Sequence, residues 1–196
     1  MKRFIRSKSV LAAAIVAGVA AWPLAQVAYA GPAEPQVPTK IQVGAGNKVF
    51  LVGHAVGVQI WGCNPTGTGF GWTLVAPRAN LYDDNGKLII THFAGPTWQA
   101  KDGSHVAGQL VDRVTVDVTA IPWLLLSATS PAAGADGDRL VGTTFIQRIA
   151  TAGGLAPGAG TCNPDTAGTT AEVPYTADYY FWKRTGHSNP AGSTGT

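Results

Sequence analysis

The sequence predicts an all-β, single-domain protein: an antiparallel β-sandwich or barrel with one long loop rich in glycine and proline. Three observations favour this class. The chain contains 25 glycines and 13 prolines, which fit many turns and few helices. Short segments alternate apolar and polar residues with the two-residue period of a strand. After residue 30, no window has the periodicity of a long amphipathic helix.

Residues 1–30 have the features of a cleavable secretory signal peptide. A basic start without acidic residues precedes an apolar run over residues 10–21, and the sequence AYA at residues 28–30 provides the small residues that signal peptidase needs. The alternative is a membrane anchor, but the apolar run has about a dozen residues where a membrane span needs about 20. We therefore expect a secreted or periplasmic protein that begins at Gly31 and has no membrane span after cleavage.

Removal of this leader changes the charge of the protein. The whole chain has 14 basic and 11 acidic residues, and four of the basic residues lie in the leader. The remaining 166 residues therefore carry a net charge of −1, and their longest basic cluster is Lys183-Arg184. Because the basic footprint of a nucleic-acid-binding protein is absent, we expect no nucleic-acid partner.

The exported part is predicted to be a single β-rich domain over residues 41–185, a length that suits one substantial core. Residues 31–40 contain three prolines and no periodicity, so they are predicted to be a flexible N-terminal segment. Residues 186–196 (GHSNPAGSTGT) are small and polar, which predicts a flexible tail.

The strands are predicted in chain order from their apolar patterns. Residues 49–52 form a short apolar run, expected in a buried strand, and Val56, Val58 and Ile60 then alternate with other residues. Residues 88–90 form a second apolar run. The segment RVTVDVT at residues 113–119 places valines on one face and polar groups on the other, which predicts a half-exposed strand.

Turns are predicted between these strands. DDNG at residues 83–86 and KDGS at residues 101–104 are hairpin signals, because Asn and Gly tolerate the positive φ of tight turns. Residues 153–170 are rich in Gly, Ala, Pro and Thr and are the predicted long loop.

The two cysteines, Cys63 and Cys162, are predicted to form a disulfide. In an oxidising compartment an even pair is most simply a disulfide, which here would close a loop of 99 residues and pin the long loop. The alternative is two free or metal-binding thiols, but without a C-x-x-C pair the evidence for zinc is poor.

A candidate site comes from the second predicted hairpin. If Asp102-Gly103 are its two loop residues, Trp98 and His105 lie on one face as diagonal neighbours. The alternative is an ordinary core tryptophan and histidines whose hydrogen bonds are satisfied by backbone or water.

The first hairpin, turned at Asn85-Gly86, adds His92 to the candidate site. It would place His92 on one face with Leu81, Leu88 and Ile90. Tyr82, just before the first turn, and Asp102, within the second, complete the set of candidate binding residues.

The sequence contains no strong catalytic or cofactor motif. Ser104 and His105 are adjacent, so in a strand they point to opposite faces and cannot form a nucleophile–base pair. G-x-S-x-G and H-E-x-x-H are absent, and the GAG at residues 44–46 precedes a strand instead of following one, unlike a dinucleotide-binding loop. We expect no cofactor and no metal.

The strings HFAGPTWQAKDGS (residues 92–104), AIPWLLL (120–126) and EVPYTADYYFW (172–182) resemble a domain-of-unknown-function family of secreted bacterial and fungal proteins. The resemblance extends to residues 50–63 and 143–157. The family has no established activity, so the resemblance implies no catalytic role. Some fungal relatives bear a malate dehydrogenase label, but the β pattern and the missing dinucleotide fingerprint argue against that activity here.

These observations favour a module that binds a carbohydrate or another small-molecule ligand, or that interacts with a surface. The alternative is a secreted hydrolytic or metal-assisted enzyme that uses His92, His105 and an aspartate. The sequence predicts no oligomeric state.

Overall fold

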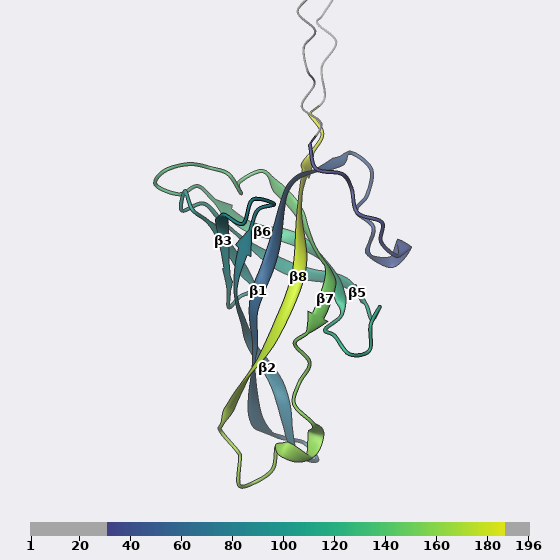
Figure 1. The fold of residues 1–196 in the computed structure, drawn as a ribbon, viewed down its shortest axis with the longest axis vertical. Coiled ribbons are helices and arrows are strands. Elements are labelled where there is room, and N and C mark those ends of the chain that lie inside the picture. Colours follow the sequence, from purple (N-terminus) through teal and green to yellow (C-terminus); the bar gives the residue numbers. More distant parts are fainter. Residues whose placement is uncertain (1–30, 187–196) are drawn as a thin grey trace, which may run out of the picture.

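The computed structural model describes residues 31–186, which form one closed barrel of eight antiparallel strands in chain order (Figure 1). The predicted signal peptide and residues 187–196 of the predicted tail lie outside the described residues. The all-β prediction is confirmed, and of the two predicted architectures the structure is the barrel. The strands are β1 (Asn47–Thr66), β2 (Gly69–Tyr82), β3 (Leu88–Phe93), β4 (Thr97–Ala100), β5 (His105–Val114), β6 (Trp123–Ala132), β7 (Thr143–Gly153) and β8 (Thr170–Arg184).

Helical structure in the described residues is limited to two short 3-10 helices, η1 (Thr39–Ile41) and η2 (Ala159–Thr161). No helix in this part of the chain is long and apolar enough to cross a membrane.

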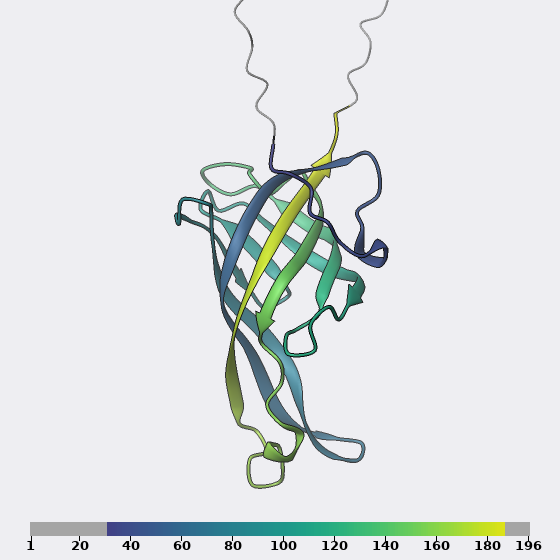
Figure 2. The ribbon, with the colours of Figure 1, turned by 45° about the vertical axis from the view of Figure 1, so that its right-hand side comes forward.

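The strands differ greatly in length, and this shapes the wall of the barrel. β1 and β2 have 20 and 14 residues, whereas β3 and β4 have only six and four. The long β1–β2 hairpin and the start of β8 extend beyond the other strands at one end (Figure 2). β2 pairs with β3 only over residues 79–82, so residues 69–78 of β2 pair with β1 alone.

Around Gly57, the inward face of β1 carries Ala55 and Gln59 and not Val56. Ala55 and Gln59 are buried, whereas Val56 is 58% exposed on the outer face. Gly57 explains this choice of face, because a Cβ there would lie 2.3 Å from the backbone oxygen of Arg78. β1 and β2 approach so closely at this point that only small side chains fit between them.

Large side chains fill the other part of the interior. The core contains Trp98, Tyr179 and Phe181 together with aliphatic residues from the surrounding strands: Leu81, Ile90, Val106, Leu140 and Ile146. Tyr179 and Phe181 therefore lie on the core side of β8, as expected for alternate residues of one strand.

The segment that contains η1 packs on the outer face of β7 and β8. The Trp182 indole donates a hydrogen bond to the Gln147 side-chain oxygen (2.8 Å), and the Gln147 amide donates to the backbone oxygen of Ile41 (2.7 Å). Ile41, the last residue of η1, is fully buried. This contact holds the segment before β1 against the barrel wall.

One strand prediction is wrong at its second half. β5 ends at Val114, and residues 115–119 of the RVTVDVT segment form no strand. Asp117 accepts hydrogen bonds from the backbone nitrogen and the hydroxyl of Thr119, both at 2.7 Å, and Val118 is 82% exposed. Local hydrogen bonds to a short polar side chain compete here with strand pairing, which residue alternation does not reveal.

The predicted disulfide and the predicted loop are both present. Cys63 and Cys162 are bonded across a separation of 99 residues. The loop between β7 and β8 spans residues 154–169 and contains η2. Gly168 donates a backbone hydrogen bond to Cys63, and Cys63 donates one to Thr169, so the loop is fastened to β1 beside the disulfide.

Candidate ligand site in the barrel interior

The β4–β5 hairpin has a different register from the predicted one. Trp98 pairs with Val106, and Gln99 pairs with His105. The Ala100 nitrogen donates to the Ser104 oxygen (2.8 Å), so this pair closes a turn of three residues, the last of which is Gly103 with a φ of 82°. A loop one residue longer than predicted moves every partner by one position and exchanges the faces of one strand. The prediction that Trp98 and His105 share a face is therefore wrong: Trp98 points into the barrel and His105 lies on the outer face.

Asp102 holds this turn together. Its carboxylate accepts hydrogen bonds from the Ser104 hydroxyl (2.6 Å), the Ser104 backbone nitrogen (2.9 Å) and the Arg139 backbone nitrogen (2.9 Å). These hydrogen bonds, the Ser104 hydroxyl foremost, lower the pKa of Asp102. The carboxylate thus links the turn to the segment before β7.

His92 and Trp98 are the two predicted site residues that the structure brings together. They pair across β3 and β4, and their rings stack with centroids 4.3 Å apart and planes 8° apart. The His92 Nδ1 lies 2.9 Å from the carbonyl oxygen of Thr97, which can only accept, so Nδ1 carries the proton. Burial lowers the pKa of His92 to about 3, so the ring is neutral at physiological pH.

The first hairpin follows its predicted faces in part. Leu81 pairs with Ile90 and Ala79 pairs with His92, and all four are buried. An irregularity at the end of β2 then sets Tyr82 opposite Leu88. Tyr82 lines neither of the cavities described next.

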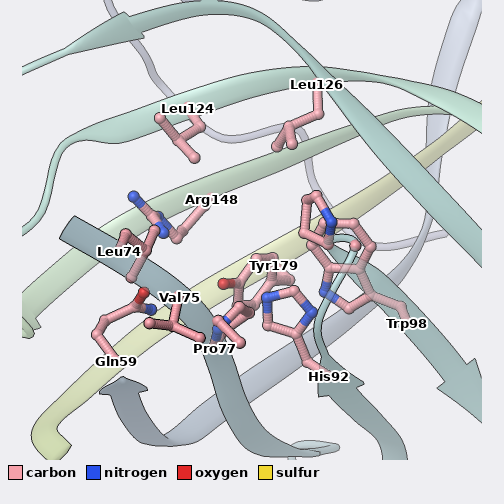
Figure 3. A pocket seen from close by; sticks show the side chains of 13 residues that line it. Gln59, Leu74, Val75, Pro77, His92, Trp98, Leu124, Leu126, Arg148 and Tyr179 are labelled. Atoms are coloured by element: carbon pink, nitrogen blue, oxygen red, sulfur yellow. The ribbon is translucent and has the colours of Figure 1, made fainter. Parts of the chain in front are cut away.

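Two adjoining cavities lie inside the barrel, with volumes of about 310 and 450 Å³. Residues on both of their walls are Gln59, Leu74, Pro96, Leu124, Leu126 and Arg148. His92, Trp98 and Tyr179 line the smaller cavity, whereas Trp61, Leu110 and Ile121 line the larger one. Figure 3 shows Arg148 and Gln59 on one side of the smaller cavity, the rings of His92 and Trp98 on the other, and Tyr179 between them.

The short β3–β4 hairpin leaves an opening to these cavities. Its turn, at Gly95 and Pro96, ends beside β5, where the Gly108 nitrogen donates to the Pro96 oxygen (3.0 Å). Beyond this turn no strand of residues 31–186 connects β2 to β5. Leu74 of β2 and Leu110 of β5 line the larger cavity there and are each 51% exposed, so they form the rim of the opening.

Arg148 is a buried cation in this largely apolar space, and the exposed Arg113 is a second cation on the wall of the larger cavity. It is 9% exposed and projects inward from β7, between Leu124 of β6 and Tyr179 of β8. Its Nε and Nη2 donate to the carbonyl oxygen of Pro122 at 3.3 and 2.8 Å. Among the described residues no carboxylate forms an ion pair with Arg148, and no Asp or Glu lines either cavity.

Two further donors in the site have no partner in the described part of the chain. These are the side-chain nitrogens of Gln59 and Trp98, in side chains that are each 1% exposed. Native proteins satisfy nearly all buried polar groups, so each of these donors is available to an acceptor from water or from a ligand.

Tyr175, near Arg148, contributes no charge. Its hydroxyl lies 3.3 Å from that of Tyr179, and burial raises the pKa of Tyr175. With His92 also neutral, Arg148 is the one buried charge among the described residues that line the cavities, because Arg113 is exposed. The described residues contain no group of three His, Cys, Asp or Glu side chains arranged to hold a metal ion.

Sequence reasoning missed Arg148 and Gln59. The signal for Arg148 was a lone charge in the apolar strand segment FIQRIA at residues 145–150. Gln59 occupies the same strand face as Ala55 and Gly57, opposite the face of Val56 and Val58, and the alternation of the valines does not single it out.

A family model described as a protein of unknown function (DUF3455) matches residues 44–183. The chain belongs to this family. The matched range contains both cysteines, the His92–Trp98 stack and Arg148, and it covers the barrel up to the penultimate residue of β8. No curated protein and no solved structure matches the chain significantly.

Proposed function

We propose that this DUF3455 protein binds one small, largely apolar molecule inside its barrel. The observation that carries the proposal is the interior cavity whose apolar walls include buried donors without partners. An eight-stranded barrel has room for side chains or for one small ligand, and ligand pockets typically combine apolar walls with a few converging polar groups.

The lining favours an apolar ligand over a carbohydrate. Sugar binding uses an open aromatic face, but one face of the Trp98 indole is covered by His92 and the ring is almost completely buried. Leucine side chains supply much of the remaining wall, including Leu74, Leu124 and Leu126. These side chains match hydrocarbon or aromatic groups better than hydroxyl groups.

The geometry gives little support to an enzyme that uses His92, His105 and an aspartate. His92 lies inside the barrel, whereas His105 is opposite the exposed Gln99 on the outer face. The Asp102 carboxylate is engaged by the backbone and hydroxyl groups of its own turn and by Arg139. No shared site joins the three.

The binding proposal is tested by titration with N-phenyl-1-naphthylamine, a neutral fluorophore whose emission rises in apolar surroundings. We expect saturable binding of one molecule per chain. Leu74→Trp, at the exposed rim, should weaken binding by narrowing the opening, while Leu155→Trp, at a loop residue that lines neither cavity, should not. Absence of saturable binding, or equal binding by both folded variants, would contradict the proposal.

We also propose that the protein acts outside the cytoplasm. Disulfides such as Cys63–Cys162 persist in oxidising compartments, which supports export. The test is cell fractionation followed by intact-mass measurement of the exported protein, expected to correspond to residues 31–196. A protein found only in the cytoplasm with its first residue retained would overturn this proposal.

A further inference from the structure

We propose that the ligand of the barrel carries a carboxylate, which Arg148 binds. This inference rests on the proposed function and names the chemical class of its ligand: an amphipathic monocarboxylic acid with an apolar body.

The first argument is the unbalanced charge of Arg148. A guanidinium is protonated at all physiological pH values, and burying a charge without a counter-ion is costly. The Pro122 carbonyl supplies only a partial negative charge, and Tyr175 and His92 nearby are neutral. No Asp or Glu among the described residues lines the cavities, so a ligand carboxylate is the proposed source of the compensating negative charge.

The second argument is the fixed position of the guanidinium. The hydrogen bonds from Nε and Nη2 to Pro122 leave the Nη1 donors unused by the described residues. The Pro122 carbonyl is itself held near β7, because the Thr151 hydroxyl donates to Ile121 (2.6 Å) and Ile121 donates to Gly153 (2.9 Å). A planar guanidinium that is held in place is well suited to a carboxylate, whose two oxygens match its donors.

The third argument is the nearness of two donor side chains at one side of the cavity. Arg148 and Gln59 lie together there beside Leu74 and Val75, and the Gln59 amide nitrogen offers a further donor. Leu126, His92 and Trp98 lie toward the other side (Figure 3). A ligand with one anionic end and an apolar body fits this arrangement, and a single buried cation matches a single negative charge.

Matched pairs of probes test the inference by calorimetric titration at pH 7. One pair is decanoate and 1-decanol, and the other is 2-naphthoate and 2-naphthylmethanol, so that each pair differs only in its polar end. We expect the acid of at least one pair to bind roughly tenfold or more tightly than its alcohol, as for loss of a charge-assisted hydrogen bond.

Two arginine variants then locate the effect. Arg148→Met keeps an unbranched side chain but removes the guanidinium, and it should remove the preference for the acid. Arg78→Met is the matched control, since Arg78 is exposed on β2 and paired with Glu172 at 2.6 Å; it should leave the preference unchanged.

The outcomes separate the two proposals. Equal binding of acid and alcohol by the native protein, or an acid preference that survives in Arg148→Met, overturns the carboxylate assignment and leaves the proposed function standing. Failure of all four probes to bind the native protein overturns the inference, and it overturns the proposed function as well if N-phenyl-1-naphthylamine also fails to bind. Even if Arg148→Met does not fold, the comparison of acid and alcohol binding by the native protein tests whether the site prefers a carboxylate.

Discussion

The indole of Trp98 occupies the space that a side chain at position 108 would need, since a Cβ on Gly108 would lie 2.9 Å from the ring. The same ring stacks on His92 and meets Tyr179 and Phe181 edge to face. Trp98 is therefore enclosed by β3, β5 and β8 at once and is a structural part of the barrel as well as a wall of the cavity.

Trp98→Ala should lower the free energy of unfolding by about 3–5 kcal/mol, the usual loss when a buried aromatic side chain is removed. Urea denaturation monitored by circular dichroism measures this loss. Trp72→Ala is the control. Because Trp72 is only half-buried, its removal should lower the free energy of unfolding by less. Similar losses in the two variants would show that Trp98 is not a core residue.

His92 should make the protein less stable as the pH falls below neutrality. Its pKa is about 3 in the folded protein and about 6.5 in the unfolded chain, so between these values the unfolded state binds more protons and stability rises with pH. From pH 7 to pH 5 this amounts to roughly 2 kcal/mol. In urea titrations, His92→Gln should reduce the change in unfolding free energy between pH 7 and pH 5 by that amount. The same change in the variant and the native protein would refute a buried neutral His92.

His54 should have the opposite effect, making the protein less stable as the pH rises. Its ring nitrogens lie 2.9 Å from Asp84 and 2.7 Å from Asp178, and these carboxylates raise its pKa. Its contribution to stability is complete below the unfolded pKa of about 6.5 and is lost as the pH rises through the raised folded value.

The difference in urea midpoint between the native protein and His54→Gln should therefore be larger at pH 6 than at pH 8.5. His105→Gln serves as the control, because His105 has no ion pair among the described residues. A His54→Gln difference that grows with pH would mean that the carboxylates do not hold the protonated ring.

The Cys63–Cys162 disulfide should stabilise the protein by up to about 4–5 kcal/mol, because it closes a loop of 99 residues in the unfolded chain. The double variant Cys63→Ser/Cys162→Ser should unfold at lower urea, and the native protein in reductant should behave like it. Peptide mapping without reductant should recover the two cysteines as one linked peptide. Two alkylatable thiols in the native exported protein would contradict the bond.

The fold class and the disulfide were accessible from the sequence, whereas the directions of several side chains were not. Alternation around Val56 predicted a strand correctly, but the tight approach of Gly57 to Arg78 turned the valine face outward. In the β4–β5 hairpin a single additional loop residue moved His105 to the outer face. Both outcomes depend on three-dimensional fit that the local pattern does not contain.

The candidate site was predictable only in part for a related reason. His92 and Trp98 are near each other in sequence, and a local hairpin brings them together. Arg148 and Gln59 reach the same cavity from β7 and β1, 89 residues apart, and meet only because the barrel closes. A lone charge in an apolar strand marks such a residue as unusual but does not identify its neighbours.

The pairing of the first strand with the last has a consequence for assembly in the cell. Until residues 170–184 pair with β1, the sheet has two free edges, and unpaired strand edges promote association with other chains. Because Cys63 lies in β1 and Cys162 lies shortly before β8, forming their bond brings both edges of the sheet together. Oxidation should then protect the newly made chain from aggregation during the interval before the barrel closes, in addition to stabilising the finished fold.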